Sequence, residues 1–315
     1  MLKKTRILLL IGGAFLIILI GSYLNKKDNK PKVVVVLKTL NTKEQYWKII
    51  ESGAKKAFKD FKIDGVVVAP NHEVKDQVDL LKNILKQKPE ALLIAPIQQS
   101  TTIPILEKYK KRHIPVLIVD THIDWNGQTS YIGTDNYLLG KTSGELLGSM
   151  LQPGDQVALI HPTVVNGDMV DRLKGARDVL EAAGIKIIAE LPADNQSGEV
   201  KKALNNIVQT FPNIKGVFAA TDMVAIGTLK ELKEKGMPIP VVGTDGNMNM
   251  VQEVEEGNNS ATIAQNPFDM GYLSVVQAIK AINGKPVEKR IDTGIDIIDQ
   301  ENAKRKIDFL TSNLK

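Results

Sequence analysis

The chain has 315 residues, no cysteine and a formal net charge of +5 at pH 7. A single hydrophobic core stops growing at about 250–300 residues, so this length predicts two domains. The absence of cysteine excludes a disulfide framework, a thiolate metal site, a cysteine nucleophile and a lipid-modified N-terminal cysteine. The positive charge is compatible with a nucleic-acid or membrane partner only if the basic residues are clustered.

The first 32 residues differ in composition from the rest. Residues 7–24 form a run of 18 residues without a charged side chain, and basic residues flank it on both sides. A membrane-spanning helix needs about 20 apolar residues, whereas a secretory signal has an apolar stretch of about 7–15 residues and a small-residue cleavage site. We therefore predict one N-terminal apolar helix, an uncleaved membrane anchor or a cleaved signal, and a polar linker up to residue 32. The length of the run favours the anchor.

The basic character of the chain is concentrated in this segment. Removing residues 1–24 removes Lys3, Lys4 and Arg6 and no acidic residue, which lowers the net charge from +5 to +2. The remaining charges are scattered, without a basic stripe or interleaved aromatic residues. The sequence therefore does not support a nucleic-acid partner.

From residue 33 onward, short β-branched runs alternate with longer amphipathic segments. In the first half, strands are predicted at 33–37, 65–69, 91–95, 116–119 and 131–132, and helices at 44–61, 74–85, 102–111 and 135–151. In the second half, strands are predicted at 157–160, 185–190, 216–219, 241–245, 261–264 and 291–298, and helices at 169–183, 199–210, 223–235, 247–256 and 268–282. This alternation predicts an α/β fold with two doubly wound parallel-sheet lobes.

Most catalytic and cofactor motifs are missing. Gly140, Lys141 and Thr142 look like the end of a phosphate loop, but Asp135 stands where that motif needs glycine. The four histidines lack metal-ligand spacing, and neither a dinucleotide-binding motif nor a G-x-S-x-G elbow is present. We expect no metal and no cofactor. Asp120 and a second strand-end aspartate, Asp245, leave a glycosidase-like acid/base pair as an alternative without further support.

In open α/β sheets, ligands bind beyond the carboxyl ends of the strands. Six ordered motifs follow one another in this chain, five at predicted strand ends and one in a predicted helix. These are Val36 to Asn41 with Gln45-Tyr46-Trp47; Ile118-Val119-Asp120; Ile132 to Asn136; Arg172 to Gly175; Phe218 to Asp222; and Val242 to Gly246 with Ala261 to Gln265. Together they resemble the type 1 periplasmic sugar-binding proteins of the ribose/galactose group. The resemblance extends from Val33 to Ala303.

The resemblance implies two lobes joined by three crossings, with a ligand in the cleft between them. The N-terminal lobe would comprise residues 33–134 and 266–293, and the C-terminal lobe residues 135–265 and 294–315. Residues 1–32 would be the anchor or signal segment with its linker.

The resemblance also implies a set of ligand-binding residues. Tyr46 and Trp47 would flank a sugar ring, Asp120 and Asp245 would accept hydrogen bonds from hydroxyl groups, and Arg172 would donate in a fixed fork. The full predicted set is Lys38, Glu44, Tyr46, Trp47, Asp120, Thr121, Thr134, Arg172, Asn195, Thr221, Asp245 and Gln265.

Three of these residues depart from the family pattern. Glu44 stands where a small polar residue is common, Thr121 replaces an arginine, and Asn195 replaces an aromatic residue. The pocket is therefore expected to hold fewer aromatic rings and arginines than a ribose site. We interpret Asp135 and Asp222 as helix N-caps instead of ligands.

The function implied by the resemblance is sugar binding, not enzymatic turnover. In one hypothesis, an extracytoplasmic protein closes on a small sugar or polyol by hinge motion and delivers it to an ABC importer. In the alternative, a membrane-tethered sensor signals to a histidine kinase or another receptor, and an uncleaved anchor would favour it. An intracellular repressor would need a DNA-reading helix-turn-helix before the domain, where residues 1–32 supply an apolar segment.

Overall fold

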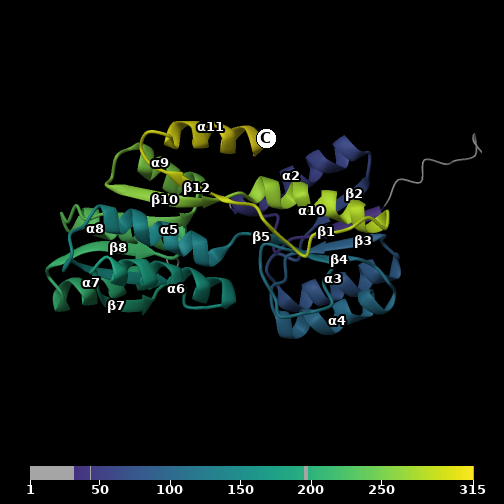
Figure 1. Cartoon of the computed structure of the whole chain (residues 1–315), viewed down its shortest axis with the longest axis horizontal. Coiled ribbons are helices and arrows are strands. Elements are labelled where there is room, and N and C mark those ends of the chain that lie inside the picture. Colours follow the sequence, from purple (N-terminus) through teal and green to yellow (C-terminus); the bar gives the residue numbers. More distant parts are fainter. Residues whose placement is uncertain (1–31, 43, 195–197, 315) are drawn as a thin grey trace, which may run out of the picture.

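The computed structural model describes residues 32–42, 44–194 and 198–314. Within them the chain forms two six-stranded sheets, each covered by helices on both faces (Figure 1). The predicted N-terminal apolar helix lies outside the described residues. None of the helices in the described ranges combines the length and apolar character that a membrane span requires.

The first sheet has the strand order β11-β5-β4-β3-β1-β2, and all its pairings are parallel. We call this sheet with its helices the first lobe. Its strands are β1 (Lys32–Val36), β2 (Asp64–Val68), β3 (Ala91–Ile94), β4 (Val116–Val119), β5 (Ser130–Gly133) and β11 (Arg290–Asp292). Helices α2 (Gln45–Phe61) and α10 (Pro267–Ile282) share one hydrophobic cluster with the sheet. Helices α3 (Val74–Lys86) and α4 (Gln99–Lys111) share another, on the opposite face.

The second sheet has the order β12-β10-β9-β8-β6-β7 and forms the second lobe. Its strands are β6 (Gln156–His161), β7 (Lys186–Pro192), β8 (Ile214–Ala219), β9 (Val241–Asp245), β10 (Ser260–Gln265) and β12 (Ile295–Ile298). One face is covered by α5 (Asn136–Ser149) and α6 (Gly167–Ala182). The other is covered by α7 (Glu199–Thr210), α8 (Asp222–Glu234), α9 (Met248–Glu255) and α11 (Ala303–Asn313).

The chain passes between the two sheets three times, after β5, after β10 and between β11 and β12. The prediction of one last strand at 291–298 was wrong, because the segment breaks at Thr293-Gly294 into two strands that join different sheets. Gly294 has φ +74°, a conformation that favours glycine and turns the chain at this point.

The second sheet is not purely parallel, which corrects the predicted fold class. Strand β12 pairs with β10 in the antiparallel direction. The reason is topological: β10 ends at a crossing, whereas β12 begins at one, so the two neighbours run in opposite directions. The C-terminal helix α11 was also missing from the predicted elements.

Glycines allow two helix pairs to pack closely. A Cβ atom at Gly271 of α10 would lie 2.0 Å from the carbonyl oxygen of Ile50 in α2. A Cβ atom at Gly140 of α5 would lie 1.8 Å from the carbonyl oxygen of Arg172 in α6. Gly140, which resembles part of a phosphate loop in the sequence, therefore serves helix packing.

Candidate functional site

Asp120 follows strand β4 and is fixed from several directions. Its backbone is in the left-handed region, with φ +65°. Its carboxylate accepts hydrogen bonds from the Tyr46 hydroxyl at 2.6 Å and the Thr121 hydroxyl at 2.8 Å. Its carbonyl oxygen accepts another from the Tyr131 hydroxyl at 2.7 Å. Burial, and then the charge of Asp120, raise the pKa of Tyr46 well above its usual value, so the phenol stays a hydrogen-bond donor.

Arg172 lies on helix α6 and is 5% exposed. Its guanidinium donates to the Asn136 side-chain oxygen at 2.8 Å, to the Ala220 carbonyl at 2.8 Å and to the Thr244 hydroxyl at 2.7 Å. It also forms an ion pair with Asp245 at 3.1 Å. The guanidinium is thus held in one orientation by four groups of the second lobe.

Asp245 is the last residue of β9 and has φ +120°. Its Oδ1 atom accepts from Arg172 at 3.1 Å and from the Gln265 amide at 2.8 Å. The Gln265 oxygen in turn accepts from the Thr134 hydroxyl at 2.7 Å. Burial raises the pKa of Asp245, and the Arg172 charge opposes that shift. Because Thr134 and Gln265 stand at the first two crossings, this chain of bonds connects the carboxylate to the segments that join the two sheets.

The interpretation of Asp222 as a helix N-cap was wrong, whereas that of Asp135 was correct. The cap of α8 is Thr221, whose hydroxyl accepts from the Val224 N–H at 3.4 Å. Asp222 is fully buried and accepts from the Thr262 hydroxyl at 2.7 Å and the Asn247 N–H at 2.6 Å. Burial, and then the nearby Asp245, raise its pKa well above the usual value. It holds the turn that follows Asp245.

Three described residues of the predicted set do not belong to this polar cluster. Trp47 is buried in the core of the first lobe, edge-to-face with Tyr46, and the Lys38 ammonium lies 5.3 Å from its ring centroid. Glu44 pairs with His72 at 2.7 Å, where both side chains are exposed. Asn195 lies outside the described residues. The structure therefore brings together Tyr46, Asp120, Thr121, Thr134, Arg172, Asp245 and Gln265.

Two residues of the site were missed from the sequence. Asn136 orients Arg172, and it stands in the motif that follows the first crossing, which was a usable signal. Asp168 of α6 accepts a hydrogen bond from the His122 N–H of the first lobe at 3.2 Å. Burial, and then the charge of Asp120, raise the pKa of Asp168 to about 6. Its sequence position at a helix start is typical of an ordinary first-turn acid, so nothing local marked it.

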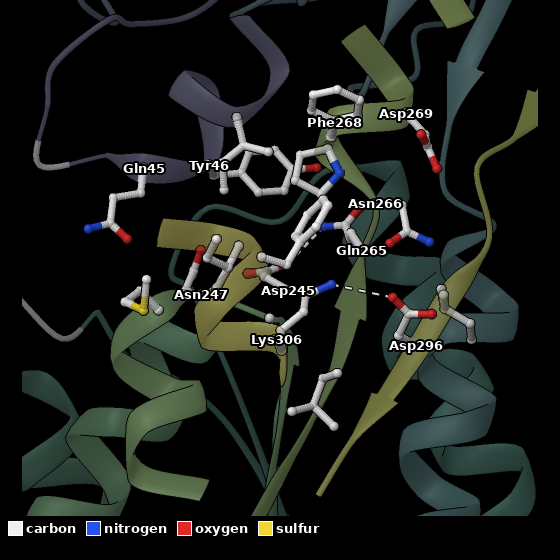
Figure 2. A pocket seen from close by; sticks show the side chains of 18 of the residues that line it. Gln45, Tyr46, Asp245, Asn247, Gln265, Asn266, Phe268, Asp269, Asp296 and Lys306 are labelled. Atoms are coloured by element: carbon white, nitrogen blue, oxygen red, sulfur yellow. Dashed lines mark hydrogen bonds and ion pairs between the residues drawn. The ribbon is translucent and has the colours of Figure 1, made fainter. Parts of the chain in front are cut away.

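Two cavities flank the cluster. One, of about 880 Å³, is lined by Tyr46, Asp245 and Gln265 and continues towards α11 (Figure 2). The other, of about 760 Å³, is lined by Lys38, Thr121 and Asp168 among others. No group of metal-ligating side chains occurs in the described part of the chain. Carboxylate, amide and guanidinium groups from both lobes instead offer acceptors and donors to a hydroxylated ligand.

Comparisons with known proteins agree on one family. The periplasmic binding protein domain matches residues 33–286. The ribose import binding protein of Haemophilus influenzae is 26% identical over 253 residues, which cover 80% of this chain and 86% of that protein. An ABC transporter solute-binding protein of Actinobacillus succinogenes, solved with bound D-allose, has a TM-score of 0.79 and 25% identity and covers 88% and 100% of the two chains. A periplasmic ribose ABC transporter protein of Conexibacter woesei has a TM-score of 0.82 at 23% identity, with coverages of 89% and 95%.

The matched domain includes strands of both sheets, except the edge strands β11 and β12, and all the residues of the polar cluster. The relatives are binding proteins, so this chain is a binding protein and not an enzyme. It belongs to the periplasmic binding protein family, and within it to the type 1 proteins of the ribose/galactose kind, as its ordered strand-end motifs predicted.

Proposed function

We propose that this protein is an extracytoplasmic solute-binding protein that binds a small sugar or polyol between its lobes and delivers it to an ABC importer. The names of the relatives, an import binding protein and two ABC transporter components, support this assignment and favour the importer over a sensor. For residues 1–32 we propose a membrane anchor or a signal segment with its linker, as their composition suggests.

The single observation that carries the proposal is the pair of strand-end carboxylates. Asp120 comes from the first sheet and Asp245 from the second, and each is already held by donors of its own lobe. Carboxylates that accept from sugar hydroxyls contribute about 1.5–3 kcal/mol each. A few such bonds reach the roughly −8 kcal/mol of a micromolar complex after ordering costs.

Closure follows from the position of these carboxylates in different lobes. A ligand bonded to both is bound fully only when the lobes are close together, so it shifts the population towards the closed form. We assign residues 33–134 and 266–293 to one moving body and 135–265 and 294–315 to the other. The three crossings would then form the hinge.

Thermal-shift and calorimetric titrations of the purified protein with D-ribose, D-allose, D-galactose, D-glucose, L-arabinose and glycerol test the proposal. We expect at least one to bind, and Asp120→Asn and Asp245→Asn to weaken its binding at least 10-fold. Asp79→Asn is the matched control, because Asp79 is exposed on α3 and, within the described part of the chain, its ion pair is with the surface residue Lys82. The proposal fails if no compound shifts the melting temperature, or if both site variants bind as the control does.

A further inference from the structure

The larger cavity extends well beyond the polar cluster. Tyr46, Asp245 and Gln265 line one end, and the other walls come from the start of α10, strand β12 and helix α11 (Figure 2). Helix α11 lies outside residues 33–286, the range that the family domain matches. This part of the cavity is therefore formed partly by an element that lies beyond the matched range.

The size of the cavity exceeds what one sugar ring needs. Its volume of about 880 Å³ lies in the upper part of the 300–1,000 Å³ range of pockets that enclose drug-sized ligands. A monosaccharide held at Asp245 and Gln265 would leave the end near α11 unfilled.

The polar groups on these walls are available to a ligand. The side chains of Gln45, Asn247, Asp269 and Arg305 line the cavity and form no hydrogen bond or ion pair among the described residues. Hydroxyl groups both donate and accept, so they match this mixture of amides, a carboxylate and a guanidinium.

Charge and aromatic surface narrow the ligand class. Lys306, which is 8% exposed, pairs with Asp296 at 3.3 Å, and Asp245 pairs with Arg172 at 3.1 Å. The two remaining charged residues of the walls, Asp269 and Arg305, are opposite in sign. The walls are thus balanced, which favours a neutral ligand. Phe268 and Phe309 also line the cavity, with ring centroids 6.3 Å apart, and aromatic rings pack against the C–H groups of sugars.

We propose that the region bounded by Asn247, Asp269, Arg305 and Phe309 is a subsite for a second sugar ring, so that the ligand class includes neutral disaccharides or glycosides. This inference rests on the proposed sugar-binding function. The first ring would contact Asp120, Asp245 and Gln265, and the second would lie against α11.

The test starts from the monosaccharide that the titrations above identify. Its homodisaccharides in each glycosidic linkage, and its methyl glycosides, are titrated against the full-length protein. We expect at least one disaccharide to bind about 10-fold more tightly than the monosaccharide. Asp269→Asn and Arg305→Ala should each weaken disaccharide binding about 10-fold and change monosaccharide binding less than 2-fold. Lys304→Ala is the matched control on α11, because Lys304 pairs with Asp308 at an exposed position and does not line the cavity.

The outcomes separate this inference from the function on which it rests. If a monosaccharide binds and every disaccharide is rejected, the subsite is refuted and the sugar-binding function stands. Disaccharide binding that is equally strong in the Asp269, Arg305 and Lys304 variants also refutes the subsite. If neither monosaccharides nor disaccharides bind, both proposals fail.

Discussion

Replacing Arg172 by methionine should destabilise the protein strongly, because four groups each lose one donor at once. The Asn136 oxygen, the Ala220 carbonyl, the Thr244 hydroxyl and the Asp245 carboxylate all accept from this guanidinium. Methionine fills much of the volume but donates nothing.

The magnitude follows from the burial of the ion pair. Removing one partner of a buried pair costs about 3–5 kcal/mol, since the other charge stays buried and uncompensated. The Asp245 side chain is 17% exposed, so water solvates part of the carboxylate and we expect a loss near 3 kcal/mol. Adding Asp245→Asn removes the uncompensated charge and should recover more than about 1 kcal/mol.

Urea denaturation of the two variants at pH 7 and pH 5 checks this reasoning. Burial already raises the pKa of Asp245, and loss of Arg172 removes the charge that lowers it. Asp245 in the folded variant then binds a proton more tightly than it does in the unfolded chain. The loss of unfolding free energy in Arg172→Met should therefore shrink as the pH falls. Arg177→Met is the control on the same helix, because Arg177 forms surface pairs with Glu181 and Glu190 and should cost less than about 1 kcal/mol. A deficit independent of pH, or no recovery in the double variant, would refute the account.

Three further predictions use the same denaturation assay. Tyr46→Phe removes the hydrogen bond to Asp120 and should cost about 1.5–3 kcal/mol; an unchanged midpoint contradicts this. The pKa of Asp168 is raised to about 6, so ionisation of this carboxyl disfavours folding. Asp168→Asn should therefore raise the free energy of unfolding by up to about 3 kcal/mol relative to the unsubstituted protein between pH 4 and pH 7. Gly271→Ala should cost about 1–3 kcal/mol or more, whereas Gly148→Ala, whose Cβ meets nothing closer than 3.9 Å, should be neutral or stabilising.

The sequence contained enough information for the order of the elements and for the groups at strand ends. Alternation of apolar runs with amphipathic segments predicted the two sheets, because central strands such as β3 and β4 are buried on both faces. Strand-end motifs pointed to Asp120 and Asp245, and the family resemblance added Arg172 of helix α6; the fold brings the three into one polar cluster. Strand ends of parallel sheets meet at one edge, so their positions follow from the topology.

Other features depended on contacts between distant segments. The role of Asp222 is set by Thr262 and Asn247, and the pattern Thr221-Asp222 before a helix fits an N-cap at either residue. Glu44 pairs with a histidine 28 residues away, which no local pattern indicates. Helix α11 buries Lys306 at a position where an amphipathic helix usually has an apolar residue. The apolar periodicity of this segment is therefore interrupted in the sequence, and the helix was not predicted.

The two carboxylates of the site are each held by side chains of the protein, and under the proposed function this determines where the cost of binding falls. Asp120 is fixed by two hydroxyl groups, and Asp245 by Arg172 and Gln265. Little side-chain entropy remains to be lost there, so in the proposed mechanism the rotation of the lobes about the crossings would be the main ordering event. The third crossing turns at Gly294, where a side chain would strain the backbone at φ +74°. A substitution at this hinge position should therefore change ligand affinity through the closing equilibrium, although it touches no group of the site.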